Sequence, residues 1–216
     1  MVCCGSVIGA ATERQFGRKR ADADLAQYRA KGPGTTVRLL LAGICKAGAV
    51  QGRLLDVGSG VGAVIFELVK LGMTSAIGVD LSSAYVVAAS SEAARRSQSE
   101  SVRFIRGDFV DVGKQLPTAD VVTLDRVICC YPESERLLDD SLRHADRLFA
   151  FSYPRDVWYV LAWVAIQNVG RRITGNPFQT FVHSAAAMES VIRRAGFELL
   201  NRTHTRTWCA DVYGRT

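Results

Sequence analysis

Leu54-Leu55-Asp56-Val57-Gly58-Ser59-Gly60-Val61-Gly62 is the stretch that decides the fold of this chain. An apolar run ends at three alternate glycines, and apolar residues then recur at helical spacing as Val64, Ile65, Leu68 and Leu71. This order predicts a buried strand, a tight turn and a helix over 62–71. Glycine lets the backbone turn sharply and lets a ligand approach it, while the start of the helix offers unpaired N–H groups. The loop therefore predicts a site for a carboxylate, a phosphate or sugar oxygens.

The same pattern of strands and helices continues along the chain. Short apolar runs predict strands at 76–79, 102–105, 121–124 and 148–151, and the segments between them predict helices at 82–98 and 133–145. Strands that alternate with helices imply a parallel sheet with right-handed crossovers. The runs 197–203 and 207–213 are close enough in sequence for a hairpin, which predicts an antiparallel edge.

Both flanks of this region carry further helical patterns. A charged helix is predicted at 13–30 and another helix at 35–47, on either side of Gly32-Pro33-Gly34. After the fifth strand the sequence predicts an apolar helix at 158–169, a polar loop at 171–177 and a last helix at 184–195.

Composition narrows the class of protein. The 216 residues are 48% hydrophobic and 22% charged, which is typical of one globular domain. The longest apolar stretch, 157–166, is too short to span a bilayer, and residues 1–11 lack the pattern of a signal peptide. The six cysteines show neither zinc-ligand spacing nor a disulfide framework, so we expect reduced thiols, no bound metal and a cytoplasmic location.

The net charge of +6 is unevenly distributed along the sequence. Residues 1–53 carry a net +6, residues 54–170 a net −4 and residues 171–216 a net +4. This is not the uniform basic stripe of a nucleic-acid binder, and we expect no nucleic-acid partner. The basic flanks indicate either an anionic partner or ordinary solvated arginines.

The glycine loop alone leaves two cofactor classes open. Gly58, Gly60 and Ala63 also satisfy the fingerprint G-x-G-x-x-A of nicotinamide-dependent oxidoreductases, and Asp80 stands where an acid holds ribose hydroxyls in either class. Asp56, however, lies inside the strand, where a dehydrogenase usually has a small apolar residue. Asp108 adds a third acid after the third strand. Both features favour a different cofactor, and the oxidoreductase remains the alternative.

Taken together, these motifs resemble the class I S-adenosylmethionine-dependent methyltransferases. The likeness rests on D-x-G-x-G-x-G at 56–62, Asp80, Gly-Asp-Phe at 107–109 and the strand 120–125, in the family's order and spacing. It implies a Rossmann-like, doubly wound α/β fold. In that fold a seven-stranded, mostly parallel sheet has an antiparallel last strand, N-terminal helices and a helical insertion after the fifth strand. The implied parts are an N-terminal lid or cap at 1–48 and a methyltransferase domain at 49–216, with the insertion at 155–183 over the acceptor site.

The resemblance also implies a role for each matching residue. S-adenosylmethionine would be the cofactor and S-adenosylhomocysteine the product. Asp80 would hold the ribose, and Arg126 would line the methionine and acceptor pockets. Tyr28 would be a lid aromatic over the cofactor, with a surface tyrosine as the alternative. The methionine part would be held by Asp56, Gly58, Ser59, Gly60 and Gly62, and the adenine by Leu81, Asp108 and Phe109.

The acceptor is less well defined by the sequence. The segment after the fourth strand lacks the Pro-Pro-aromatic motif of enzymes that methylate amino groups of DNA bases. We therefore expect a small apolar or aromatic acceptor, including anionic ones, methylated at O, N or C (EC 2.1.1). The catalytic candidates are Tyr131, as a pocket contact or acid/base, and His183, as a general base; core and structural roles are their alternatives. This region is similar to uncharacterised bacterial methyltransferases and, over a shorter stretch, to magnesium-protoporphyrin O-methyltransferases.

Other functions remain open beside a small-molecule enzyme. An RNA or protein methyltransferase would share the fold, but we expect no added recognition domain in a chain of this length. A non-catalytic binder would keep the cofactor pocket. The aromatic segment 157–172 has three interpretations: an acceptor lid, a core helix, or a peripheral membrane contact with Arg171-Arg172 at its polar end.

Overall fold

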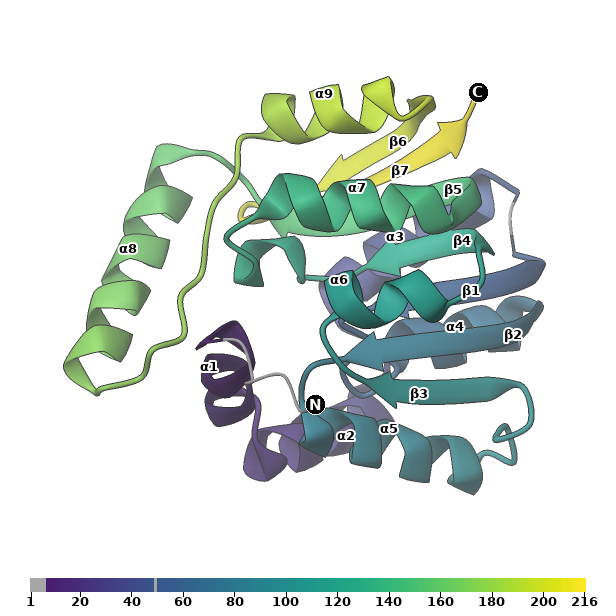
Figure 1. Ribbon diagram of the computed structural model, residues 1–216, viewed down its shortest axis with the longest axis horizontal. Coiled ribbons are helices and arrows are strands. Elements are labelled where there is room, and N and C mark those ends of the chain that lie inside the picture. Colours follow the sequence, from purple (N-terminus) through teal and green to yellow (C-terminus); the bar gives the residue numbers. More distant parts are fainter. Residues whose placement is uncertain (1–6, 49) are drawn as a thin grey trace.

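The computed structural model describes residues 7–48 and 50–216. These residues form a seven-stranded sheet in the order β3-β2-β1-β4-β5-β7-β6 (Figure 1). Strands β1 to β5 pair in parallel, and β7 is antiparallel to both of its neighbours. The predicted α/β fold class, with its antiparallel last strand, is therefore confirmed. The strands are β1 Gly52–Val57, β2 Met73–Asp80, β3 Val102–Arg106, β4 Ala119–Leu124, β5 Ala145–Pro154, β6 Phe197–His204 and β7 Trp208–Arg215.

Helices cover both faces of the sheet, as Figure 1 shows. The cluster of buried residues on one face includes α3, α4 and α5, and the cluster on the other face includes α6, α7 and α9. The helices are α1 Val7–Gln15, α2 Arg18–Lys31, α3 Thr35–Lys46, α4 Ala63–Leu71, α5 Ser83–Arg95, α6 Phe109–Val112, α7 Ser134–His144, α8 Trp158–Ile173 and α9 Ala185–Arg194, with single 3₁₀ turns η1 Gly113–Gln115 and η2 Ile128–Cys130.

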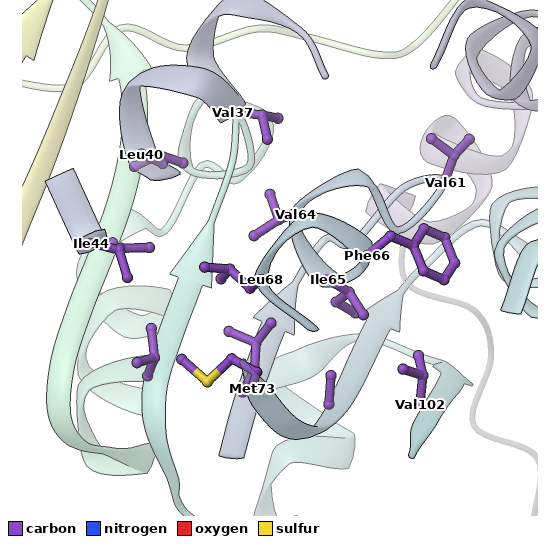
Figure 2. Packing of buried hydrophobic residues seen from close by; sticks show 14 of the residues in the cluster. Val37, Leu40, Ile44, Val61, Val64, Ile65, Phe66, Leu68, Met73 and Val102 are labelled. Carbon is purple, nitrogen blue, oxygen red and sulfur yellow. The ribbon is translucent and has the colours of Figure 1, made fainter. Parts of the chain in front are cut away.

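The two cores follow from the alternation of side chains along buried strands. Leu54 belongs to the first cluster and Leu55 to the second, and each is at most 2% exposed. Parallel strands with helices on both faces bury both sets of side chains, which explains the unbroken apolar runs in the sequence. Figure 2 shows the first core, in which Val37 and Leu40 of α3 lie close to Val64 of α4.

Several element boundaries differ from the prediction. The helix predicted at 13–30 is wrong as a single element, because the chain breaks at Phe16-Gly17 into α1 and α2. Ser82 Oγ donates a hydrogen bond to the carbonyl of Phe16 at 2.7 Å, a contact over 66 residues that local periodicity cannot report. The apolar helix predicted to end at 169 continues to Ile173, and β5 runs over ten residues, of which Leu148 to Pro154 pair with β7.

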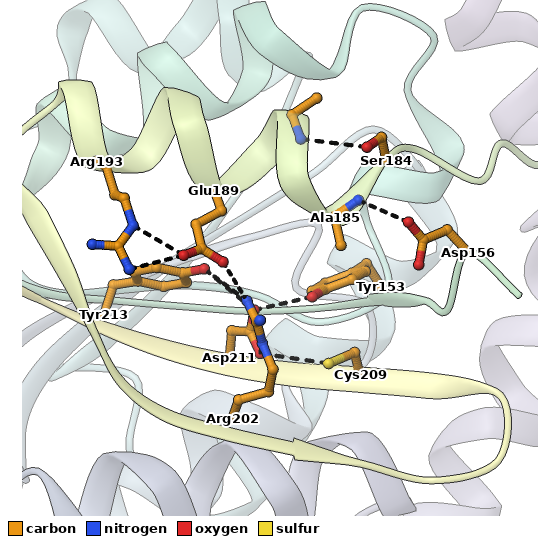
Figure 3. Close-up of polar contacts among 11 residues, drawn as sticks. Tyr153, Asp156, Ser184, Ala185, Glu189, Arg193, Arg202, Cys209, Asp211 and Tyr213 are labelled. Atoms are coloured by element: carbon orange, nitrogen blue, oxygen red, sulfur yellow. Dashed lines mark hydrogen bonds and ion pairs between the residues drawn. The ribbon is translucent and has the colours of Figure 1, made fainter.

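A buried carboxylate holds the antiparallel edge to the helix layer. Asp211 of β7 is fully buried and accepts hydrogen bonds from Arg202 Nε at 2.9 Å and from Tyr153 Oη at 3.0 Å (Figure 3). Arg202 also pairs with Glu189 of α9 at 2.9 Å. Hydrogen bonds to an ionised group are roughly twice as strong as neutral ones, so this network fixes β5, β6, β7 and α9 relative to one another.

The two ends of the insertion after β5 lie next to each other. A carboxylate oxygen of Asp156, just before α8, accepts a hydrogen bond from the backbone N–H of Ala185 at the start of α9 (Figure 3). The distance between the two atoms is 3.3 Å. Residues 157–184, which comprise α8 and the loop behind it, therefore form a loop-like insertion whose two ends meet at the edge of the sheet.

Replacing Gly62 tests the tightest part of the β1–α4 turn. Gly62 has φ +81°, and a Cβ there would lie 2.8 Å from the rings of both Phe104 and Phe66. We expect Gly62→Ala to lower the free energy of unfolding by about 2–4 kcal/mol, since left-handed strain and overpacking add. Denaturant unfolding followed by circular dichroism measures this loss.

Gly175→Ala is the matched control. Gly175 has φ +67° but open space around its Cβ position. Gly175→Ala should lower the free energy of unfolding by only about 1 kcal/mol, because it adds backbone strain but no overpacking. Equal losses in the two variants would contradict the argument that the turn is packed against Phe104 and Phe66.

Candidate functional site

The glycine loop leaves β1 and is held against the end of β2. The backbone N–H groups of Gly58 and Ser59 both donate to the carbonyl of Val79, at 2.7 and 3.0 Å. Gly58, Gly60 and Gly62 all have positive φ, between +53° and +81°. Helix α4 follows without any side-chain cap, so the N–H groups of its first turn remain available to a ligand.

One hydroxyl in the loop has no partner. Ser59 Oγ is buried and makes no hydrogen bond within the described part of the chain. Because an unpaired buried hydroxyl is costly, a ligand that reaches this loop would gain from pairing with it.

Asp80 ties the same loop to the start of α5. One carboxylate oxygen accepts from the N–H of Gly60 and the other from the N–H of Ser82, both at 2.8 Å. Each oxygen has further acceptor capacity, which suits hydroxyl groups of a ligand. Burial raises the pKa of Asp80 to about 6, and the two backbone donors partly oppose this shift.

Two more acids converge at the ends of β1 and β4. Asp56 is 1% exposed, and its Oδ1 accepts a hydrogen bond from Thr123 Oγ1 at 2.6 Å. Burial raises the pKa of Asp56 to about 8, and the neighbouring Asp125 adds to the shift. Asp125 accepts from Ser152 Oγ at 2.6 Å, and burial raises its pKa as well. This concentration of acidic oxygens favours a cationic ligand group beside the glycine loop.

Asp108 lies at the end of β3, next along the same edge of the sheet. It caps α6 by accepting from the N–H of Val110, and Tyr131 Oη donates to its Oδ2 at 3.3 Å. Burial raises the pKa of both side chains. Phe109 is 4% exposed and meets the ring of His144 edge-on, so its ring lies in the core. Leu81 is half-buried beside Asp80.

Comparison with known proteins agrees with this arrangement. A family model described as "Methyltransferase domain" matches residues 50–172. The chain belongs to the methyltransferase domain family. Among the curated proteins no sequence matches.

Several solved structures have the same fold as this chain. Magnesium protoporphyrin IX methyltransferase from Synechocystis PCC 6803, crystallised with bound S-adenosylhomocysteine, superposes with a TM-score of 0.74 at 20% identity, over 96% of this chain and 99% of that one. A TehB-like methyltransferase from Corynebacterium glutamicum gives 0.61 at 17% identity, over 92% and 98%. The (4+2)-cyclase SpnF gives 0.67 at 15% identity, over 94% and 96%. The fold therefore carries more than one chemistry.

Two residues expected at the cofactor make their described side-chain contacts with other residues. Tyr28 donates to Glu67 at 2.8 Å and lies under the guanidinium of Arg96, on the helix layer formed by α2 and α4. Arg126 has φ +61°, is exposed and stacks over Trp208 at 5.2 Å. Its neighbour Val127 is the residue that packs on Gly58.

His183 fastens the insertion to the turn after β4. Its Nε2 lies 3.1 Å from the carbonyl of Ile128 and 3.0 Å from the carbonyl of Tyr131. Because both carbonyls only accept, Nε2 carries the proton, and the general-base prediction for His183 would have to operate through Nδ1. The N–H of Phe181 donates to the carbonyl of Cys129 at 2.7 Å and strengthens the same attachment.

The two segments that the resemblance implied as a lid and as an insertion meet as a cover over this edge of the sheet, through contacts that the sequence did not indicate. Arg14 of α1 donates to the carbonyl of Gly175 at 2.8 Å, and Asn176 donates to Gln15 at 2.7 Å. Phe16 packs edge-on against Phe178, with 5.2 Å between ring centroids. Segments 161 residues apart thus meet, which no local pattern reveals.

The other side of α1 is attached to the cofactor half of the domain. Glu13 accepts from the N–H of Ser83 at 3.0 Å and pairs with Arg106 at 2.9 Å. Phe16 also packs against Tyr85, whose ring lies closest to Gly60. Helix α1 therefore connects the start of α5 with the loop behind α8 across the candidate site.

The described residues offer no metal centre and no membrane span. No group of three or more His, Cys, Asp or Glu residues among them is arranged to hold a metal ion. Within the same ranges, no helix combines the length and the hydropathy needed to cross a bilayer.

Asp56→Asn tests the buried acid through the pH dependence of stability. The folded-state pKa of about 8 lies above the ordinary value of 3.8. Between these values the folded protein keeps a proton that the unfolded chain has released, so wild-type stability falls as pH rises. We expect the melting temperature of Asp56→Asn, relative to wild type, to increase from pH 5 to pH 8.

The exposed acid Asp139 provides the control. Asp139→Asn should leave the pH profile of the melting temperature parallel to that of wild type. Parallel profiles for Asp56→Asn as well would show that Asp56 ionises normally in the folded protein.

Proposed function

We propose that this chain transfers a methyl group from S-adenosylmethionine to an O, N or C atom of a small apolar or aromatic acceptor and releases S-adenosylhomocysteine. The observation that carries the proposal is the convergence of Asp56, Asp80 and the uncapped start of α4 on one glycine loop, in a chain of the methyltransferase domain family. Crystals of the Synechocystis relative with S-adenosylmethionine and with S-adenosylhomocysteine support the choice of cofactor.

The residues present fit each part of that cofactor. The free N–H groups at the start of α4 suit its carboxylate, and the buried acids Asp56 and Asp125 suit its positive charges. Asp80 has acceptor capacity for the ribose hydroxyls, and Asp108 for the adenine amino group. A cationic ligand would stabilise the ionised form of Asp56, whereas a pyrophosphate would gain nothing from this acid, which speaks against the nicotinamide alternative.

The chain's own residues then act mainly by positioning. The cofactor supplies a methyl group already activated on a sulfonium sulfur. Phe16 packs against both Phe178 and Tyr85 where α1 and the loop behind α8 meet, and this aromatic cluster would limit the access of water to the edge of the sheet. The aromatic cluster also supports an apolar or aromatic acceptor.

A base is needed only where the acceptor keeps its proton at neutral pH. Tyr131 has a raised pKa, so it holds its proton and can donate a hydrogen bond but does not remove a proton. His183 can accept a proton at Nδ1 while Nε2 stays bonded to the turn after β4. Among the two catalytic candidates, His183 is therefore the one suited to a base.

Asp80→Ala tests the cofactor assignment. Loss of a charged acceptor for two hydroxyls removes about 1.5–3 kcal/mol per hydrogen bond. We expect the dissociation constant for S-adenosylmethionine, measured by calorimetry, to rise about a hundredfold or more. Asp111→Ala, at an exposed position on α6, should bind as wild type does. Unchanged affinity in Asp80→Ala would remove Asp80 from the site.

Labelled S-adenosylmethionine with a native metabolite extract tests turnover. Since a cyclase shares this fold, cofactor binding alone does not establish methyl transfer. We expect a labelled small molecule detectable by mass spectrometry, and slower labelling by His183→Ala if the acceptor needs a base. Label on RNA or on protein would favour an RNA or protein methyltransferase. A thermal shift with NADPH but not with S-adenosylmethionine would favour a nicotinamide-dependent oxidoreductase.

A further inference from the structure

Helix α8 presents apolar side chains to solvent along its whole length. We call the residues Trp158, Ala162, Ile166, Val169 and Ile173 the outer stripe; they recur every three or four positions and so share one face of the helix. Trp158 and Ile173, at the two ends, are each 80% exposed, and Ile166 in the middle is 63% exposed. Trp163 and Leu161 flank the stripe and are exposed as well.

The inner face of α8 is apolar in its first half, where Val160 is 3% exposed, and polar in its second half. Asn168 donates to the carbonyl of Thr180 at 2.8 Å and accepts from its N–H at 3.0 Å. Arg171 donates to Asn168 and to Thr180 Oγ1 at about the same distances. A helix on the surface of a globular protein normally turns its apolar face inward and its polar face outward. Helix α8 carries apolar side chains on its outer face as well as at Val160, and the outer stripe lacks a partner within the described chain.

The segment that carries the outer stripe has only basic charges, and the exposed Asp156 stands just before it. No Asp or Glu occurs from residue 157 to residue 188. Arg172 is exposed at the end of α8. Arg206 is exposed at the tip of the β6–β7 turn. Tyr159 Oη donates a hydrogen bond to the carbonyl of Arg206 at 2.7 Å, which holds this turn beside the start of α8. Neither arginine has an ion-pair partner among the residues that the structure describes.

We propose that α8 docks on an anionic lipid surface. The outer stripe would enter the boundary between headgroups and acyl chains, and Arg172 and Arg206 would contact lipid phosphates at the two ends of the helix. Sixteen residues span about 24 Å, a length suited to lying in the interface plane. Tryptophan and tyrosine prefer this zone, since their rings are apolar and their polar atoms remain hydrated.

A second copy of this chain explains the features less well. A two-fold interface between two α8 helices would bury the outer stripes but would bring the arginines of both copies together. The acid-free segment offers them no carboxylate in return. Lipid phosphate supplies the missing negative charge, and that complementarity selects the lipid surface.

Docking of α8 would also turn the candidate site towards the bilayer; this part of the inference rests on the proposed function. Helix α8 leads directly into the loop that meets α1 through Gly175 and Asn176, and Figure 1 shows α8 standing at the border of the molecule away from the sheet. The cover of the site would then face the bilayer, so that an apolar acceptor dissolved in lipid could enter without crossing water.

Vesicle flotation tests the docking. Wild-type protein should float with vesicles of phosphatidylglycerol and phosphatidylcholine and should stay in solution with phosphatidylcholine alone. Trp158→Ser/Ile166→Ser removes the tryptophan and the central isoleucine of the outer stripe, and its partition coefficient should fall about tenfold or more. Val87→Ser/Leu200→Ser, at exposed apolar positions on other elements, should float as wild type does.

Charge reversal provides the second measurement. Arg172→Glu/Arg206→Glu should lose binding to the anionic vesicles, whereas Arg18→Glu/Lys19→Glu, on the exposed side of α2, should keep it. Affinity for S-adenosylmethionine, measured by calorimetry, should be unchanged in all four variants and shows that they are folded. A failure of the proposed function would appear in that affinity and leave flotation intact.

Two results would overturn the proposal. One is wild-type protein that does not float with anionic vesicles. The other is a dimer in light scattering that Trp158→Ser/Ile166→Ser converts to a monomer, because a second copy would then cover the outer stripe.

Discussion

Parallel pairing of β1 with β2 on one side and β4 on the other brings the ends of these strands to one edge of the sheet. The candidate site depends on this constraint, because strands β1 and β2 end in Asp56 and Asp80 and β4 leads into Asp125. Parallel strands buried on both faces leave little water around their ends, so burial raises the pKa of all three acids. Hydrogen bonds from Thr123, Ser152 and the glycine loop offset part of that cost, and a cationic ligand would offset the rest.

The cover over this edge depends on attachments made elsewhere. Asp211 fixes the antiparallel edge, and Asp156 closes the base of the insertion that carries α8. From that base the loop reaches η2 through His183 and α1 through Asn176. These attachments are polar contacts joined by the packing of Phe16 on Phe178, and polar contacts near the surface open at a lower free energy than core packing. A rigid sheet thus carries a cover that can part to admit ligands.

Helix α8 differs from the other helices in exposing a row of large apolar side chains to solvent. Core positions elsewhere agree with pattern and burial, whereas α8 exposes Trp158 and Ile166 and bonds Asn168 and Arg171 to the loop behind it. Departures of this kind concentrate at functional sites, because a surface that binds something cannot also be optimised for water. The same helix joins the cover of the candidate site, so association at its outer face and access to the sheet edge are structurally connected.

The sequence by itself determined the strand–glycine–helix unit, the order of strands and helices, the antiparallel last strand and the positions of Asp56, Asp80 and Asp108. These features follow from local periodicity and from the rule that parallel strands end at one edge. The tertiary structure alone decided that Phe16 and Phe178 meet, that Tyr28 lies on the helix layer, that His183 is fastened at Nε2 and that α8 turns its outer stripe to solvent. Amphipathic periodicity tells which residues share a face of a helix, but the direction in which that face points is set by contacts with residues far away in the chain.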